Sequence, residues 1–182
     1  MFKFEEKFDC LENDELKLEI IEKYAGDEVL TPFYYYDIMR KCDNKVVGKI
    51  SIRIGTNFHS YYNGHIGYEI DKNFRGNNYS YKASKLVLEV AKFHNMKSLY
   101  LTCEENNIAS YKTIEKLGAS LIEFCDIPQE YFAYRAGMPK YRIYQLKINW
   151  LLWGFMIKFY WREYESKFKS NYNWKWKSFN NV

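Results

Sequence analysis

The feature that most constrains the fold of this chain is a junction at which a short strand runs into an amphipathic helix through a polar turn. The strand pattern is GHIGYEID at residues 64–71, and the turn is RGNNYS at residues 75–80. After the turn, packing positions recur at intervals of three and four, which predicts a helix with one face on a sheet. These positions are Ala83, Leu86, Val87, Val90, Ala91 and His94. A strand that leads into such a helix is typical of domains that combine helices with a sheet.

The segments around this junction predict the other elements. PFYYYDIMR and KVVGKISIRIG are rich in β-branched and aromatic residues and are joined by a short polar connection, so they predict a hairpin. SLYLTC predicts a strand, EENNIASYKTIEKLGA predicts a helix that ends at Gly118, and SLIEFCDI and PKYRIYQLKI are the last strand candidates. The order predicts an α/β or α+β fold with a mixed sheet.

Two segments before the junction are predicted to lack strands. The first thirty residues predict an amphipathic helix, and its apolar positions are Leu16, Leu18, Ile20, Ile21 and Tyr24. GTNFHSYYNG, at residues 55–64, has turn residues at both ends and predicts a loop. Its aromatic side chains either contact a substrate or fold back on the sheet.

The RGNNYS turn is a candidate anion site. The N–H groups in the first turn of a helix have no partner within the helix, and the helix dipole favours negative charge there. Gly76 tolerates a positive φ, and Asn77 or Asn78 is the non-glycine type that tolerates it best. Ser80 is small enough for a phosphate to approach. We therefore expect the turn to bind phosphate, although Asn stands where such turns usually carry a second glycine.

Two motifs make the chain from about Lys45 to Leu146 resemble the GCN5-related N-acetyltransferase (GNAT) superfamily. The nucleotide motif of the family is (Gln/Arg)-x-x-Gly-x-(Gly/Ala); its positions fall here on Arg75, Asn78 and Ser80, of which only the arginine agrees. The stretch LTCEENNIASYKTIEKLGA is similar to the second-motif helix of the family. Its matching positions are Asn107, Ser110, Lys116, Leu117 and Gly118.

The resemblance implies a fold, a cosubstrate and a reaction. The fold is a mixed, mostly antiparallel central sheet with splayed middle strands, flanked by helices. Acetyl-CoA lies between the GHIGYEID and SLYLTC strands and gives its acetyl group to a primary amine of a small molecule, a peptide or a protein; no metal is implied. The implied cofactor contacts are Tyr68, Ile70, Arg75, Gly76, Asn77, Asn78, Tyr79, Ser80, Asn107 and Ser110.

Three side chains are candidates for proton transfer. An amine must lose a proton before it attacks a thioester, and a base within reach speeds that step. His65 has an ordinary pKa near neutrality and shares a strand face with Glu69, so both are candidate bases; the alternative for each is an ordinary strand residue. Many relatives place a tyrosine seven residues after the motif asparagine to protonate the leaving thiolate. That position is Ile114 here, which leaves Ser110 or a water as the donor.

The cysteines and the N-terminus indicate a cytoplasmic protein. The four cysteines are far apart and fit neither CxxC nor Cys/His metal spacing, so we expect reduced, mostly buried thiols. They are Cys10, Cys42, Cys103 and Cys125. MFKFEEKFDC lacks the basic leader and apolar core of a secretion signal.

A domain over residues 1–149 is expected to precede an aromatic, basic extension over residues 150–182. Six cations and two acids in residues 151–182 give +4, the formal net charge of the whole chain, so the body is neutral and nucleic-acid binding is not indicated for it. WLLWGFMIKFYW, at residues 150–161, is shorter than the roughly 20 residues that span a bilayer. It could dock on the domain, form a homodimer, lie at a membrane interface, or be poorly ordered.

Two other functions stay open. The departures at Asn78 and Ile114 fit a non-catalytic acyl-CoA-binding or sensor domain, and the tail fits a membrane- or partner-docking protein. The sequence names neither the acceptor amine nor the oligomeric state.

Overall fold

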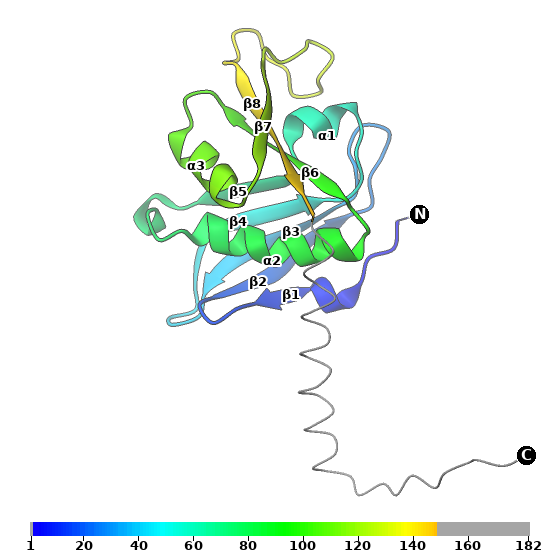
Figure 1. Cartoon of the computed structure of the whole chain (residues 1–182). Coiled ribbons are helices and arrows are strands. Elements are labelled where there is room, and N and C mark those ends of the chain that lie inside the picture. The colour runs from blue at the N-terminus through cyan, green and yellow to red at the C-terminus, as the bar shows by residue number, and fades with distance from the viewer. Residues whose placement is uncertain (1, 149–182) are drawn as a thin grey trace, which may run out of the picture. The chain divides into compact units, whose positions relative to one another are not determined.

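The computed structural model of this chain describes residues 2–148 and consists of two antiparallel sheets with helices around them (Figure 1). The strands are β1 (Cys10–Glu12), β2 (Leu16–Tyr24), β3 (Phe33–Arg40), β4 (Lys45–Arg53), β5 (Ile66–Ile70), β6 (Ser98–Glu104), β7 (Ser120–Cys125) and β8 (Tyr141–Lys147). The helices are α1 (Phe58–Asn63), α2 (Tyr79–Phe93) and α3 (Ile108–Lys116), with short 3-10 turns at Glu6–Phe8 and Lys72–Phe74. The predictions for residues 150–182 lie outside the described residues.

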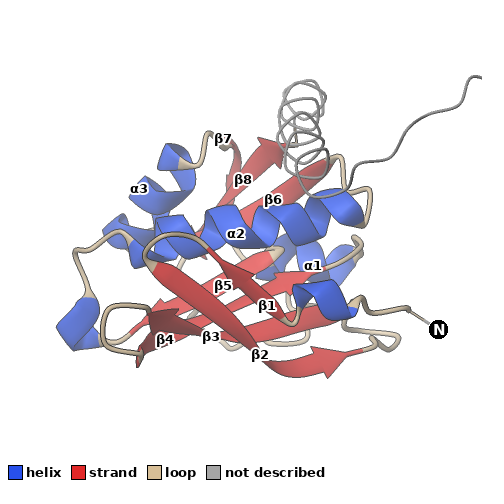
Figure 2. Cartoon of the chain, turned by 90° about the horizontal axis from the view of Figure 1, so that it is seen from below, coloured by secondary structure: helices blue, strands red, loops and turns tan. Residues whose placement is uncertain are grey.

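The two sheets have the order β1-β2-β3-β4-β5 and β6-β8-β7, and every neighbouring pair is antiparallel. Helix α2 lies across one face, as Figure 2 shows from below. The expected mostly antiparallel architecture flanked by helices is therefore confirmed. The predicted hairpin is β3–β4, and the predicted helices after residues 78 and 107 are α2 and α3.

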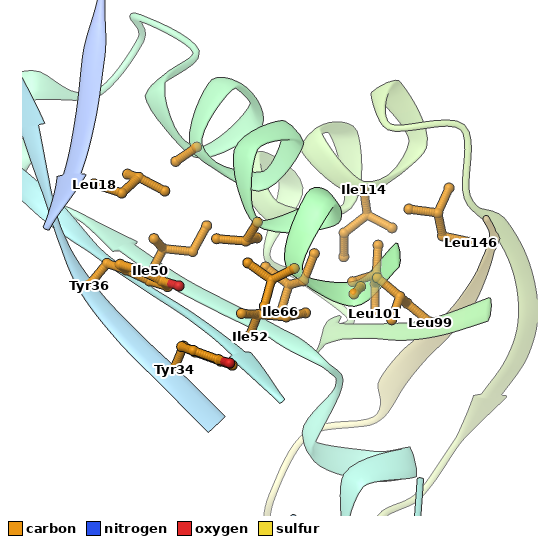
Figure 3. Packing of buried hydrophobic residues seen from close by; sticks show 14 of the residues in the cluster. Leu18, Tyr34, Tyr36, Ile50, Ile52, Ile66, Leu99, Leu101, Ile114 and Leu146 are labelled. Carbon is orange, nitrogen blue, oxygen red and sulfur yellow. The ribbon is translucent and has the colours of Figure 1, made fainter. Parts of the chain in front are cut away.

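The core lies between α2 and the sheets. The inner face of α2 is fully buried at Ala83, Val87, Val90 and Ala91. It packs against buried side chains of the five-stranded sheet and of β6 (Figure 3). Burial of each large apolar side chain stabilises the fold by about 1.5–3 kcal/mol. The recurring apolar positions that predicted the helix are thus the ones that hold it on the sheet.

Residues 16–24 form a strand, so the helix predicted there is wrong. Leu16 and Leu18 are fully buried on one face, whereas Ile21 is 43% exposed. A register shift between Ile20 and Glu22 interrupts the alternation, because a bulge places two successive residues opposite one partner. The interrupted pattern looks helical in the sequence, and pairing with β1 and β3 decides the conformation.

Residues 55–64 are not wholly a loop, because α1 occupies Phe58–Asn63. Asn57 and Ser60 form a capping box. The Asn57 side chain accepts from the Ser60 N–H at 2.7 Å, and the Ser60 hydroxyl accepts from the Asn57 N–H at 2.8 Å. Reciprocal capping starts a helix even when the helix is short. The spacing of Asn57 and Ser60 was the signal for this element.

The cysteines are free, but the expectation that they are mostly buried is wrong. Cys103 is buried, Cys125 is half-buried, and Cys10 and Cys42 are exposed. The exposed pair lies in β1 and in the β3–β4 turn, at the periphery of the five-stranded sheet.

Strands β5 and β6 meet at one end and then separate, as the splayed middle strands of the expected fold do. The His65 N–H donates to the Tyr100 carbonyl at 2.7 Å, and the Tyr100 N–H donates to His65 Nδ1 at 2.8 Å. Beyond this point β5 pairs with β4, and β6 pairs with β8. The imidazole thus takes the place of a main-chain acceptor at the apex of a wedge between the two sheets.

Candidate active site

The main-chain N–H groups of residues 76–81 lie together at the start of α2 and are called the cradle below. Gly76 has φ +86° and Asn78 has φ +58°, so the left-handed conformation expected for this turn is present at both residues. The first helical bond runs from the Lys82 N–H to the Asn78 carbonyl at 3.0 Å. The N–H groups of residues 76–81 donate to no acceptor within the described part of the chain. They are therefore available to an anion.

The asparagine side chains do not block this cradle. The Asn77 amide donates to the Phe74 carbonyl at 3.0 Å, and Asn78 Oδ1 accepts from Lys116 Nζ at 3.1 Å. Asn78 makes no capping bond to the helix that it precedes. Arg75 Nε donates to the Ile70 carbonyl at 3.0 Å, which fixes the base of the turn to the end of β5. The two asparagine side chains thus form their hydrogen bonds with other groups and leave the free N–H groups accessible.

A first cavity of about 510 Å³ opens beside the cradle, a size in the usual range for ligand pockets. Nine of the ten expected cofactor contacts line it, and Asn77 is the exception. The opposite wall comes from α3 and includes Lys112 and Lys116, neither of which had been assigned as a contact. Their spacing of four residues puts both on one helix face, and this was the signal available in the sequence.

A second cavity of about 310 Å³ lies in the wedge between β5 and β6. Tyr68, Asn107 and Ser110 line both cavities, so the two adjoin at these residues. The Tyr68 hydroxyl is 3.1 Å from Ser110 Oγ, and Asn107 Oδ1 accepts from the Ser110 N–H at 3.1 Å. Burial raises the pKa of the Tyr68 hydroxyl, which is therefore protonated at neutral pH. An elongated ligand could follow the two cavities from the cradle into the wedge.

His65 is not part of either cavity. Its side chain is fully buried, and it lines neither the cradle cavity nor the wedge cavity. Nδ1 accepts from the Tyr100 N–H, while Nε2 lies 3.0 Å from the Gly55 carbonyl, so the partners assign the proton to Nε2. Burial lowers the pKa of the imidazole. A neutral ring with both nitrogens engaged has no free position to take a proton from an amine, so the structure does not bring this candidate base to the site.

Glu69 is exposed and lines the first cavity. It makes no hydrogen bond or ion pair to another of residues 2–148 through its carboxylate. Ser110 is half-buried at the boundary of the two cavities. The structure therefore separates the three proton-transfer candidates: two border the cavities, and His65 holds the strands together.

Ile114, at the position where many relatives carry a tyrosine, is 2% exposed and lines the second cavity. It packs in the core between α3 and β6 (Figure 3). The chain supplies no hydroxyl at this position. The hydroxyl side chains that line the same cavity include those of Ser110 and Tyr68.

Comparison with known proteins identifies this architecture. Residues 5–120, well over half of the chain, match the family described as Acetyltransferase (GNAT) domain. The chain belongs to the GNAT acetyltransferase family. Among curated proteins, none matches it. The free N–H groups at α2 and the wedge between β5 and β6 are thus features of a GNAT domain.

Several solved GNAT structures share the fold. A candidate ribosomal-protein-serine acetyltransferase from Vibrio cholerae aligns with TM-score 0.56 and 13% identity over 76% of this chain and 97% of its own. The ribosomal-protein-S5-alanine acetyltransferase from Vibrio fischeri aligns with TM-score 0.51 and 19% identity over 63% of this chain. This chain covers 61% of the Vibrio fischeri protein and 65% of an acetyltransferase from Bacillus anthracis, less than two thirds of each.

Between residues 2 and 148, no helix is both long and apolar enough to cross a bilayer. In the same range, no group of three or more His, Cys, Asp or Glu side chains is arranged to hold a metal ion.

Proposed function

We propose that this GNAT protein transfers the acetyl group of acetyl-CoA to a primary amine of a small molecule, a peptide or a protein. The observation that carries the proposal is the run of free N–H groups from Gly76 to Tyr81 beside a cavity of ligand size. A Cβ added at Gly76 would meet nothing within 4 Å, so the approach to these groups is open. The positive end of the α2 dipole adds to their attraction for a diphosphate.

The proposal gives each part of acetyl-CoA a place. The diphosphate accepts hydrogen bonds from the N–H groups of residues 76–81, and Lys112 and Lys116 supply positive charge from α3. The pantetheine arm runs along β5 near Tyr68 and Ile70 and passes Asn107 into the wedge. The thioester then lies in the second cavity, close to Ser110.

The chemistry requires two proton transfers. The amine nitrogen attacks the thioester carbonyl carbon, the new C–N bond forms, and the C–S bond breaks. We assign removal of the amine proton to Glu69, through water or directly, because its exposed carboxylate directly follows Tyr68, which lines the second cavity where the thioester would lie. We assign the proton that the departing thiolate receives to the Ser110 hydroxyl, which is itself within hydrogen-bonding distance of the Tyr68 hydroxyl at 3.1 Å. Each transfer contributes typically 10²–10⁴-fold to such reactions.

The test combines calorimetry of acetyl-CoA binding with an assay of thiol release over a panel of amines. The chain offers a matched pair of variants, because Asn78 and Asn95 lie in the same left-handed conformation at opposite ends of α2. Asn78→Asp should weaken acetyl-CoA binding, whereas Asn95→Asp should leave it unchanged. Equal affinities for both variants would show that the diphosphate binds elsewhere.

A second candidate is a non-catalytic acyl-CoA-binding domain, which the absence of a hydroxyl at Ile114 favours. The same experiments separate it from the enzyme. Acetyl-CoA binding without thiol release for any amine would support the binding domain and refute the transferase.

A further inference from the structure

A third cavity, of about 300 Å³, lies on the face of the five-stranded sheet that points away from α2. On β4, Lys49, Ser51 and Arg53 point to this face and line the cavity, whereas the alternating residues Ile50 and Ile52 are fully buried in the core (Figure 3). Aromatic side chains from β3 and carboxylates from β2 and β5 complete the wall. They are Phe33, Tyr35, Glu22 and Glu69.

The two cations of this cavity differ in their partners. Lys49 Nζ forms an ion pair with Asp37 at 3.1 Å. Arg53 forms no ion pair with any carboxylate of residues 2–148. Its single hydrogen bond to the described residues is a long one, from Nη1 to the Gly64 carbonyl at 3.4 Å. Most of the five N–H donors of the Arg53 guanidinium are therefore without an acceptor in the described structure.

The guanidinium lies directly over Gly67. A Cβ added at Gly67 would meet Ser51 Oγ at 3.2 Å, Arg53 Nη1 at 3.3 Å and Arg53 Nη2 at 3.7 Å, so the missing side chain gives the guanidinium its place. The next residue, Tyr68, lines all three cavities. The Arg53 cation is thus separated by one strand, β5, from the path that we propose for the thioester.

Burial is the main cause that lowers the pKa of Arg53, and Tyr131 and Tyr35 partly oppose it. The side chain still keeps part of its surface open to solvent. A partly buried guanidinium without a partner is costly to fold, and planar guanidinium groups bind carboxylate and phosphate oxygens in pairs. The Arg53 guanidinium is therefore suited to bind an anionic group of a ligand in the third cavity.

We propose that Arg53 binds an anionic group of the acceptor, so that the substrates of this protein are amines that also carry a carboxylate or a phosphate. This inference rests on the proposed acetyl transfer. Glu69 follows Gly67 by two residues on the same strand face and is exposed, so it can attract the ammonium end of the same molecule. A bifunctional acceptor therefore meets the Arg53 cation over Gly67 and, two residues further along β5, the Glu69 carboxylate. Lys49 lies opposite Glu69 but already forms an ion pair with Asp37.

The first experiment measures anion binding without turnover. The full chain is labelled with ¹⁵N-arginine and saturated with coenzyme A, and the Arg53 Nε–Hε signal is assigned from its loss in Arg53→Lys. Acetate and inorganic phosphate are then titrated separately, with the exposed Arg135 as the internal control. We expect a saturable shift of the Arg53 signal with one of the two anions, which also tells carboxylate from phosphate. An Arg53 signal that drifts in parallel with Arg135 in both titrations would overturn the inference.

The second experiment measures thiol release with amines in matched pairs, glycylglycine against glycylglycinamide and phosphoethanolamine against ethanolamine. We expect the wild type to prefer the anionic member of one pair, and Arg53→Gln to lower kcat/KM for that member by about 10- to 100-fold, the usual effect of losing hydrogen bonds to a charged group. The kcat/KM of the neutral member and the affinity for acetyl-CoA should stay unchanged. Lys45→Gln, which removes a cation at the far end of β4, is the matched control.

The outcomes separate this inference from the proposed function. Turnover without preference for an anionic member, or a preference that survives Arg53→Gln, would overturn the inference and leave the transferase standing. Absence of both acetyl-CoA binding and turnover would refute the transferase, and the Arg53 titration, repeated without coenzyme A, would then decide the anion site alone. A purely structural arginine would reveal itself by a lower Tm in Arg53→Gln; we expect Tm to be unchanged or higher, because no ion pair is lost.

Discussion

Replacing His65 by alanine should destabilise the protein through the apex of the wedge. The substitution leaves the Tyr100 N–H and the Gly55 carbonyl without their partners at 2.8 Å and 3.0 Å. Each buried polar group that loses its partner costs about 1–3 kcal/mol, and the cavity left by the ring adds to this. We expect the free energy of unfolding to fall by about 3–5 kcal/mol.

The same imidazole should make stability depend on pH. Burial lowers the pKa of His65 in the folded state, whereas an unfolded histidine titrates near 6.5. Below about pH 6.5 the unfolded state therefore binds more protons than the folded state. The stabilisation is complete above the unfolded pKa and is lost as the pH falls towards the folded pKa, with a slope of at most about 1.4 kcal/mol per pH unit.

Urea unfolding of the wild type, His65→Ala and His65→Gln at several pH values between 5 and 8 measures both effects. His65→Gln should remove the share of the pH slope that His65 contributes, and Lys97→Gln, an exposed change beside β6, should keep the full slope. An unchanged urea midpoint in His65→Ala would refute the role assigned to the imidazole. If the free energy of unfolding depended on pH equally in the wild type and in His65→Gln, the pH dependence could not be assigned to His65.

Three other substitutions test the remaining parts of the site. Asn78→Asp adds a negative charge to the wall of the first cavity and pairs it with Lys116, one of the two cations assigned to the diphosphate. Calorimetry should therefore find acetyl-CoA binding about 5- to 30-fold weaker at low salt, corresponding to about 1–2 kcal/mol, and less weakened at high salt. Asn95→Asp should not change the affinity. Gly48→Ala would overlap the Glu69 carbonyl in the β4–β5 pair, and urea unfolding should detect a loss of several kcal/mol or no folded protein. Ser110→Ala should lower kcat in the thiol-release assay by about 10²-fold or more if the hydroxyl protonates the thiolate, with little change in acetyl-CoA affinity.

Local patterns in the sequence were sufficient for the elements that carry the phosphate cradle. The stripe from Ala83 to Ala91 predicted α2, and the mixture of glycine and asparagine before it predicted the left-handed turn that Gly76 and Asn78 adopt. Both depend on neighbours in the chain, and such features can be read without a tertiary structure. The same holds for the β3–β4 hairpin.

The misassigned elements depend on contacts between distant residues. The bulge between Ile20 and Glu22 becomes visible only when β2 is paired with β3. The role of His65 depends on Tyr100, and that of Arg53 on the absence of a side chain at Gly67 on the neighbouring strand. The alternation of side chains along the strand correctly placed His65 on the same face as Glu69. It did not predict that the imidazole is enclosed at the apex of the wedge while the carboxylate is exposed to solvent.

The left-handed Asn78 has a consequence for how relatives of this chain are recognised. A glycine at that position leaves the unfolded backbone more freedom, whereas asparagine loses less backbone entropy on folding and is the side chain that tolerates the required positive φ best. Sequence searches that demand glycine there pass over such chains. A pattern defined by the backbone angle, accepting Asn wherever its side chain has a distant partner such as Lys116, would retrieve them.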